Sequence, residues 1–170
     1  MARAFTRESD NESLDEIVVE PKEVLPPGVK NYITPEGARR LRADLGSLVD
    51  ERPRLREAIG EEPEPADKKR LRELDRKIRY LDERVSGLEI VEPPGKIPDR
   101  VVFGATVTVA DEDGIEKSYQ ISGVDETDPD NGKVSWISPI ARALTSRAVG
   151  DEVQLDLPRG RVVLEILKIE

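Results

Sequence analysis

Two residue types are missing from this chain of 170 residues: cysteine and histidine. The lack of cysteine excludes disulfides, thiolate catalysis and cysteine-ligated zinc. The lack of histidine removes the usual general base and the commonest metal-binding imidazole. Any chemistry must therefore use carboxylates, lysines and hydroxyls, or must take place in an active site that another protein supplies.

Large apolar side chains are also scarce. Aromatic residues make up 4% and apolar residues 36% of the chain, so we do not expect one large core. Charged residues make up 37%, which is typical of long solvated helices or disordered stretches. No stretch has the length and apolarity of a transmembrane helix, and the N-terminus MARAFTRESDNESLDE lacks the apolar centre of a signal peptide. We therefore expect a soluble, cytoplasmic protein that makes no membrane contact.

The balance of charge is acidic, with a formal net charge of -9. Such a charge disfavours binding of free DNA or RNA through overall electrostatics. Contact with nucleic acid must then be local or made inside a complex with another protein. Acidic residues are scattered through residues 1–30, which hold few large apolar groups, so we predict that this extension is mostly disordered.

The segment NYITPEGARRLRADL carries the signals that begin a helix. Thr34 can cap it, Pro35 fits its first position, and Glu36 suits the positive end of its dipole. Pro53 lies inside the helical pattern and should kink the helix or remove one backbone hydrogen bond. The apolar residues then recur in a heptad seam, in which Arg52 fills one position: Leu41, Leu45, Leu48, Leu55 and Ile59.

A second helical seam follows the proline-rich stretch GEEPEPAD. Two seams joined by so short a turn predict an antiparallel coiled-coil hairpin over residues 31–90, with its tip at 60–67. Each arm of about 25 residues would be roughly 37 Å long, which places the tip far from the rest of the protein. The second seam consists of Leu71, Leu74, Ile78, Leu81, Val85 and Leu88.

Residues 91–100, VEPPGKIPDR, form a linker with three prolines and a glycine. Beyond it, apolar residues alternate with polar ones, which predicts a small, mostly antiparallel β domain over residues 101–170. One short helix, SPIARALTSRAVGD, interrupts the strands, with Ser138 as its cap and Gly150 near its end. The predicted fold class is therefore α+β with two domains. The alternating positions include Ala105, Val107, Val109, Tyr119, Ile121, Val153, Leu155 and Leu157.

From about Tyr32 to the C-terminus, the chain resembles the GreA/GreB family of bacterial transcript cleavage factors, and especially its GreB branch. The extension before this region has no counterpart in the usual members. The resemblance implies an N-terminal coiled-coil hairpin and an FKBP-like C-terminal domain. It rests on the ordered blocks ITPEG, ERP, KKRLRELDRKIRYL, VVFGATVTVADEDG, YQISGVDETD, SWISPIARAL and VGDEV.

The resemblance also implies a function. Family members bind RNA polymerase through the C-terminal domain, at the rim of the secondary channel of its largest catalytic subunit, and extend the hairpin toward the active centre. Two tip acids help to hold the second magnesium ion and to orient the water that cleaves backtracked RNA. Alignment on Gly60 places Glu61 and Glu64 at these catalytic and metal-binding positions, with Asp67 as a further acid. The resemblance thus implies a monomeric factor that is no enzyme itself, has no cofactor of its own and uses the magnesium of the polymerase.

The tip also departs from the family pattern. Glu61 replaces an aspartate, Pro63 and Pro65 replace a serine and an asparagine, and aromatic residues that follow the family's tip are absent. The arms look shorter by about ten residues together, or roughly 7–8 Å of reach. Three interpretations stay open: a tip that assists cleavage, a non-cleaving regulator that occupies the channel, and an ordinary acidic turn.

Two further candidate sites follow from the same resemblance. The basic residues at the start of the second arm could contact the 3′ end of the nascent RNA, or could form a solvated surface that pairs with neighbouring acids. The loop and helix at ISPIARAL could bind the polymerase, or could form a capped surface helix; an acid of GreB-type members is replaced by Ile137. Trp136 is expected in the core. The RNA-contact candidates are Lys68, Lys69, Arg70, Arg72 and Arg76, and the polymerase-binding candidates are Ile137, Ser138, Pro139 and Arg142.

Two functions of other classes also remain. An FKBP-like domain raises the possibility of prolyl isomerisation, but an isomerase pocket needs a cluster of aromatic side chains. This region has only Phe103, Tyr119 and Trp136. The hairpin could also belong to a coiled-coil adaptor with no role at the polymerase, which would not co-purify with that enzyme.

Overall fold

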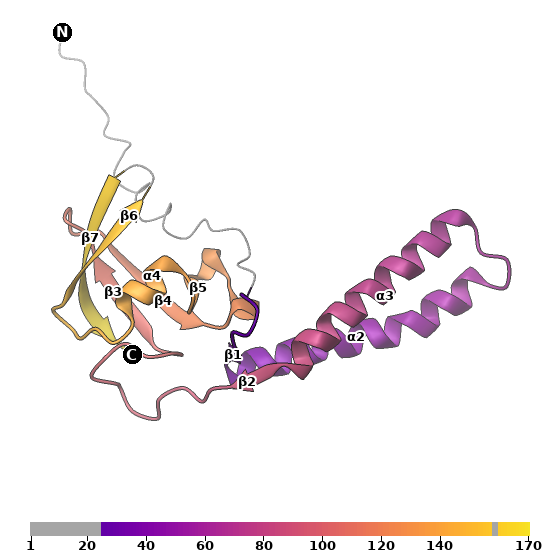
Figure 1. The fold of residues 1–170 in the computed structure, drawn as a ribbon, viewed down its shortest axis with the longest axis horizontal. Coiled ribbons are helices and arrows are strands. Elements are labelled where there is room, and N and C mark those ends of the chain that lie inside the picture. The colour runs from indigo at the N-terminus through magenta and orange to yellow at the C-terminus, as the bar shows by residue number, and fades with distance from the viewer. Residues whose placement is uncertain (1–24, 158–159) are drawn as a thin grey trace, which may run out of the picture.

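A computed structural model describes residues 25–157 and 160–170, so most of the predicted disordered extension lies outside the described residues. Figure 1 shows a helical hairpin that projects away from a compact β domain. No helix in the described part of the chain is long and apolar enough to cross a membrane. The elements are β1 (Asn31–Ile33), α2 (Pro35–Ile59), α3 (Pro65–Ser86), β2 (Leu88–Ile90), β3 (Thr106–Ala110), β4 (Glu116–Ser122), η1 (Val124–Glu126), η2 (Pro129–Asn131), β5 (Lys133–Ser135), α4 (Pro139–Leu144), β6 (Glu152–Leu157) and β7 (Gly160–Ile169).

The two predicted seams form the contact between α2 and α3. Every α2 position assigned to the seam is buried or half-buried, whereas the positions between Leu41 and Ile59 that lie outside it are exposed. Leu55 of α2 and Leu74 of α3 are the most deeply buried seam residues, at 8% and 5% exposure. Thr34 caps α2 by accepting a hydrogen bond from the Gly37 amide at 3.1 Å. The helix continues through Pro53 to Ile59.

An ion pair fills the polar position of the seam. The Arg52 Nε donates to Asp75 Oδ1 across the hairpin at 2.5 Å, and both side chains are partly exposed. This hydrogen bond lowers the pKa of Asp75 and raises the pKa of Arg52. Because the pKa of Asp75 is lowered by folding, the pair stabilises the hairpin above the unfolded-state pKa, and this stabilisation is lost as the pH falls through the folded-state pKa. At Arg52, the one seam position of α2 without an apolar side chain, an ion pair to Asp75 therefore links the two arms.

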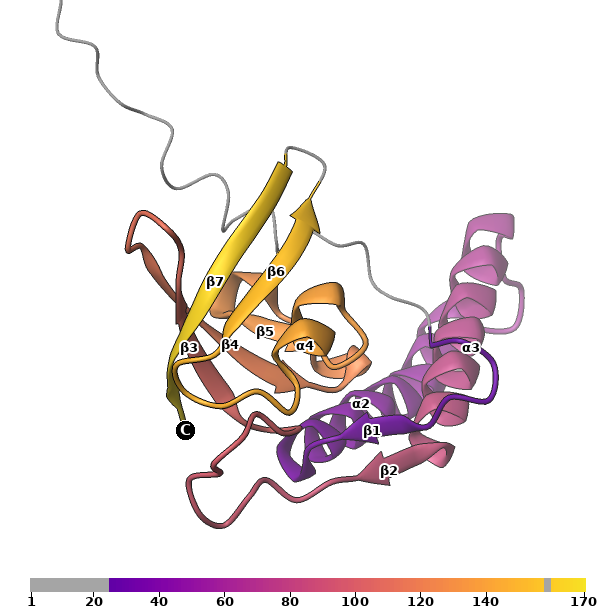
Figure 2. The ribbon, with the colours of Figure 1, turned by 60° about the vertical axis from the view of Figure 1, so that its left-hand side comes forward.

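A parallel pair of short strands closes the base of the hairpin, which the sequence patterns did not indicate. Asn31 pairs with Leu88 and Ile33 with Ile90, and the Val91 amide donates to the Ile33 carbonyl at 2.9 Å. The prediction that Leu88 continues the helical seam is therefore wrong: α3 ends at Ser86, and Leu88 begins β2. Figure 2 shows β1 and β2 side by side at the base of the hairpin.

The second domain is one five-stranded sheet in the order β5-β4-β3-β7-β6. All its pairings are antiparallel except that of β4 with β5, and a register shift between Thr108 and Val109 interrupts the pairing of β3 with β7. The α4 residues Ile140, Ala141 and Leu144 pack into the core with the inward-facing residues of the sheet. The two-domain α+β fold predicted from the periodicity is confirmed.

The short helix α4 differs from its predicted length. The sequence pattern continues it to the neighbourhood of Gly150, but it ends after six residues at Leu144. The Thr145 side chain donates to the Ala141 carbonyl at 2.6 Å, and Ser146 takes a left-handed conformation, with φ of 68°. The chain therefore leaves the helix in a loop, in which the Ser146 amide donates to the Val101 carbonyl at 2.8 Å.

Candidate functional site

The hairpin tip presents carboxylates to solvent at the far end of the two helices. Gly60 ends α2 with φ of 73°, a conformation that glycine adopts without steric cost, and α3 begins at Pro65. Glu61, Glu62 and Glu64 are exposed. Glu64 stands at the N-cap position of α3, but its side chain makes no capping hydrogen bond. The carboxylate of Glu64 is therefore not used by its own helix.

The donor set of this tip suits magnesium in kind. Carboxylate oxygens are hard ligands of the type that Mg²⁺ prefers, and this ion commonly takes one or two protein carboxylates together with waters or substrate oxygens. Within the described ranges, no group of three or more acidic side chains is arranged so that it could hold a metal ion. The tip therefore offers the type of oxygen that magnesium takes, without a cluster of three protein ligands in the described part of the chain.

The basic candidates on α3 are all exposed, but the helix does not bring all of them to one face. Lys68, Arg72 and Arg76 follow each other at intervals of four residues, so they form one stripe along the arm. Arg70 lies on a different side of the helix, because two residues correspond to about 200° of rotation. Lys69 lies within 4.0 Å of Glu73 in an exposed ion pair. The stripe Lys68, Arg72 and Arg76 is therefore the continuous basic surface closest to the tip.

The candidates for polymerase binding separate into two buried and two exposed residues. Ile137 is 8% and Ser138 is 6% exposed, and the Ser138 hydroxyl caps α4 by accepting from the Ala141 amide at 3.2 Å. Pro139 and Arg142 are exposed. Of the four candidates, only Pro139 and Arg142 remain as predicted direct contacts with the polymerase. Ile137 and Ser138 are buried and stabilise the loop that precedes α4. Trp136 packs against the core, as predicted.

A connection between the two domains is the main feature that sequence reasoning missed. Glu126, buried at 8% exposure, accepts hydrogen bonds from the Thr34 amide at 2.9 Å and from the Thr34 hydroxyl. It also accepts from the amide of Gly123 at 3.1 Å. The residue that caps α2 is thus bound by a carboxylate of the β domain, 92 residues further along the chain.

The neighbouring acid, Asp125, binds the other arm of the hairpin. Arg84, near the end of α3, donates from Nη2 to Asp125 Oδ1 at 2.7 Å and from Nε to both carboxylate oxygens at 3.1 Å. The Asn31 side-chain amide donates to Asp125 Oδ2 at 2.8 Å. Aromatic contacts flank this network, because the Tyr32 ring lies 5.1 Å from that of Trp136 and 6.2 Å from that of Phe103. The blocks ITPEG and GVDETD, which showed no relation in the sequence, meet here.

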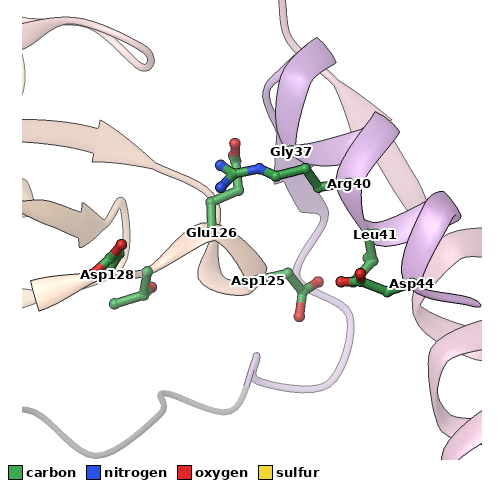
Figure 3. A pocket seen from close by; sticks show the side chains of 8 residues that line it. Gly37, Arg40, Leu41, Asp44, Asp125, Glu126 and Asp128 are labelled. Atoms are coloured by element: carbon green, nitrogen blue, oxygen red, sulfur yellow. The ribbon is translucent and has the colours of Figure 1, made fainter. Parts of the chain in front are cut away.

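A small polar pocket of about 210 Å³ lies beside this connection. Figure 3 shows Arg40 and Asp44 of α2 on one side of it and Asp125 and Glu126 on the other. Asp125 and Glu126 are already bound to residues of the hairpin. We therefore assign this pocket to the edge of the contact between the two domains.

Several known proteins are similar to this chain. The family model "Transcription elongation factor, GreA/GreB, C-term" matches residues 96–170. The transcription elongation factor GreB of Neisseria meningitidis serogroup B is 42% identical over 153 residues, covering 83% of this chain and 94% of that protein. GreA of Desulfovibrio desulfuricans is 36% identical over 148 residues, covering 81% and 91%. A solved structure of the transcription factor Gfh1 aligns with 84% of this chain and 98% of its own, at 23% identity and a TM-score of 0.41.

The relatives decide the family, because their identity to this chain extends over both the hairpin and the β domain and covers nearly their whole length. This chain belongs to the GreA/GreB family of transcription elongation factors, whose members bind RNA polymerase, and it is GreB-like.

Proposed function

We propose that this factor binds in the secondary channel of RNA polymerase and assists magnesium-dependent cleavage of backtracked RNA through Glu61 and Glu64. The observation that carries the proposal is the exposure of these carboxylates at the far end of a hairpin whose arms have 25 and 22 residues. Arms of this length extend roughly 33–37 Å, enough to carry the tip well away from the docked β domain. The factor acts as a monomer on the hydrolytic activity of the polymerase and has no catalytic centre of its own.

In this proposal Glu61 and Glu64 would complete the ligands of the second magnesium ion of the polymerase. A second ion stabilises both the attacking and the leaving oxygens of phosphoryl hydrolysis, and a carboxylate can orient the attacking water. The stripe Lys68, Arg72 and Arg76 is placed to pair with phosphates of the extruded RNA 3′ end. On the β domain, Pro139 and Arg142 face solvent and are the candidate contacts with the rim of the channel.

A second function, non-cleaving regulation of the channel, is favoured by the prolines of the tip. Pro63 is half-buried in the turn and Pro65 occupies the first position of α3, so the turn is restricted. A tip with a restricted backbone, at the end of shortened arms, would not reach the magnesium ion of the polymerase. It would instead affect nucleotide entry or pausing.

Cleavage assays on stalled, backtracked elongation complexes separate these two functions. At saturating factor, the wild type should accelerate shortening of the RNA, and Glu61→Gln/Glu64→Gln should reduce this acceleration by on the order of 100-fold, because the second ion loses both added ligands. Glu62→Gln is the matched control, since it removes the same charge from the same exposed turn and should keep most of the activity. A wild type that binds the complex and slows nucleotide addition, but never stimulates cleavage, would establish the regulatory function instead.

A further inference from the structure

The turn η1 holds both arms of the hairpin through two consecutive acids. Glu126 binds the entry of α2 through the amide and the hydroxyl of Thr34. Asp125 binds the end of α3 through two nitrogens of Arg84 and binds β1 through Asn31. A turn of three residues, Val124–Glu126, therefore contacts the start of one arm, the end of the other and the strand that precedes them.

These bonds are shielded from water. Glu126 is 8% exposed, and the side chains of Arg84 and Asp125 are 18% and 12% exposed. Hydrogen bonds to an ionised group are stronger than those between neutral groups, and a low local dielectric strengthens them further. Removing one partner would leave buried donors unsatisfied, which is a larger effect than the loss of an exposed ion pair. The connection at η1 is thus built to hold one geometry.

Small changes at this base are amplified at the tip. An arm of 25 residues is about 37 Å long, so a tilt of about 10° at the base moves the tip by about 6 Å. Magnesium accepts its ligands near 2 Å, which leaves little tolerance for such a displacement. The direction of the hairpin is therefore as important for a tip carboxylate as the identity of that carboxylate.

We infer that Asp125 and Glu126 are positioning residues, which fix the direction of the hairpin relative to the β domain and so determine where Glu61 and Glu64 are delivered. The inference about the tip rests on the proposed function, whereas the inference about hairpin direction does not. Neither acid contacts the tip: Glu126 acts through Thr34, and Asp125 acts through Arg84.

The absence of native cysteine allows a direct test of this direction in the free protein. Spin labels at Glu57→Cys, on the exposed face of α2 near the tip, and at Glu152→Cys, on the exposed side of β6, report the distance between the hairpin and the β domain. We expect one narrow distance distribution in the otherwise native chain. Glu126→Leu removes the oxygens that accept hydrogen bonds from Thr34 and Gly123, and Asp125→Asn removes the negative charge that pairs with Arg84. Each variant should at least double the width of the distance distribution.

Two control variants separate positioning from a general loss of structure. Glu126→Gln keeps an oxygen for the two backbone amides and an amide group that can donate to the Thr34 hydroxyl, so it should restore the narrow distribution. Asp130→Asn makes the same change of charge as Asp125→Asn at an exposed position of the neighbouring turn η2 and should have no effect. Thermal denaturation of each variant shows whether it is folded, and Asp125→Asn provides the milder test if Glu126→Leu does not fold.

The second measurement is RNA cleavage by the unlabelled variants in backtracked complexes. Glu126→Leu and Asp125→Asn should lower the rate at saturating factor by tenfold or more, with little change in the concentration that gives half-maximal stimulation, because the exposed surface at Pro139 and Arg142 is untouched. Unchanged distance distributions in both variants would overturn the inference, and so would broadened distributions with full cleavage at saturation. If the native chain stimulates no cleavage, the proposed function fails, while the distances still decide the role of η1 in hairpin direction.

Discussion

Replacing Leu74 with aspartate is expected to unfold the helical hairpin and leave the β domain folded. Leu74 is the only buried residue of α3, at 5% exposure, and lies on the seam that packs against α2. Loss of a buried leucine alone costs about 2–5 kcal/mol, and a buried unpaired charge costs more. Most of the stability of a helix in a protein comes from packing of its apolar face, so the two arms depend on mutual burial of their seams.

Far-ultraviolet circular dichroism measures this effect, because α2 and α3 contain most of the helical residues in the described part of the chain. The helical signal should fall strongly in Leu74→Asp, while protease-resistant β domain should remain. Val49→Asp is the matched control: it places the same charge at an apolar position of the opposite arm that is already 47% exposed, and should keep the wild-type spectrum. Wild-type helicity in Leu74→Asp would show that the seam does not support the hairpin.

Two glycines of α2 should respond in opposite directions to replacement by alanine. A Cβ at Gly37 would lie 2.1 Å from Glu126 Oε1, so the carboxylate must move and lose its bonds to Thr34 and Gly123. We expect Gly37→Ala to lower the free energy of unfolding by about 2–4 kcal/mol. A Cβ at Gly46 would meet no atom within 4 Å, so Gly46→Ala should raise the free energy of unfolding by about 0.5–1 kcal/mol through helix propensity alone.

Chemical denaturation followed by the helical signal compares the two alanine variants directly. Because Gly46 lies in the same helix and receives the same substitution, the difference between the variants isolates the contact with Glu126. Equal stabilisation by both alanines would mean that the Glu126 side chain moves aside without a loss of stability. That result would contradict the tight packing at η1.

The features that could be predicted from the sequence are those with a period. The steps of three and four residues along α2 and α3 are the steps at which a helix returns to one face, so the buried positions Leu55 and Leu74 could be named in advance. Alternation likewise indicated β3, β4 and β6, which are long enough to show it. The exposed tip followed from the prolines between the seams.

The features that could not be predicted depend on contacts between distant residues or on very short elements. β1, β2 and β5 have three residues each, too few for alternation to be distinguished from chance. Glu126 binds Thr34, which is 92 residues away in the sequence, and Asp125 binds Arg84, which is 41 residues away. No local sequence pattern predicts such pairs. The only sequence signal was indirect: Asp125 and Glu126 are consecutive acids in a segment that also holds Asp128 and Asp130, and such a cluster is equally compatible with a solvated turn.

The position of the tip within the transcription complex is the most direct test of the central claim. A structure of the factor bound to a backtracked polymerase gives the distance from the carboxylates of Glu61 and Glu64 to the second magnesium ion. We predict that at least one of these carboxylates coordinates the ion at about 2 Å or contacts it through one bound water. A docked factor whose tip ends about 7–8 Å short of the ion, the reach that shorter arms would lose, would contradict a role in cleavage.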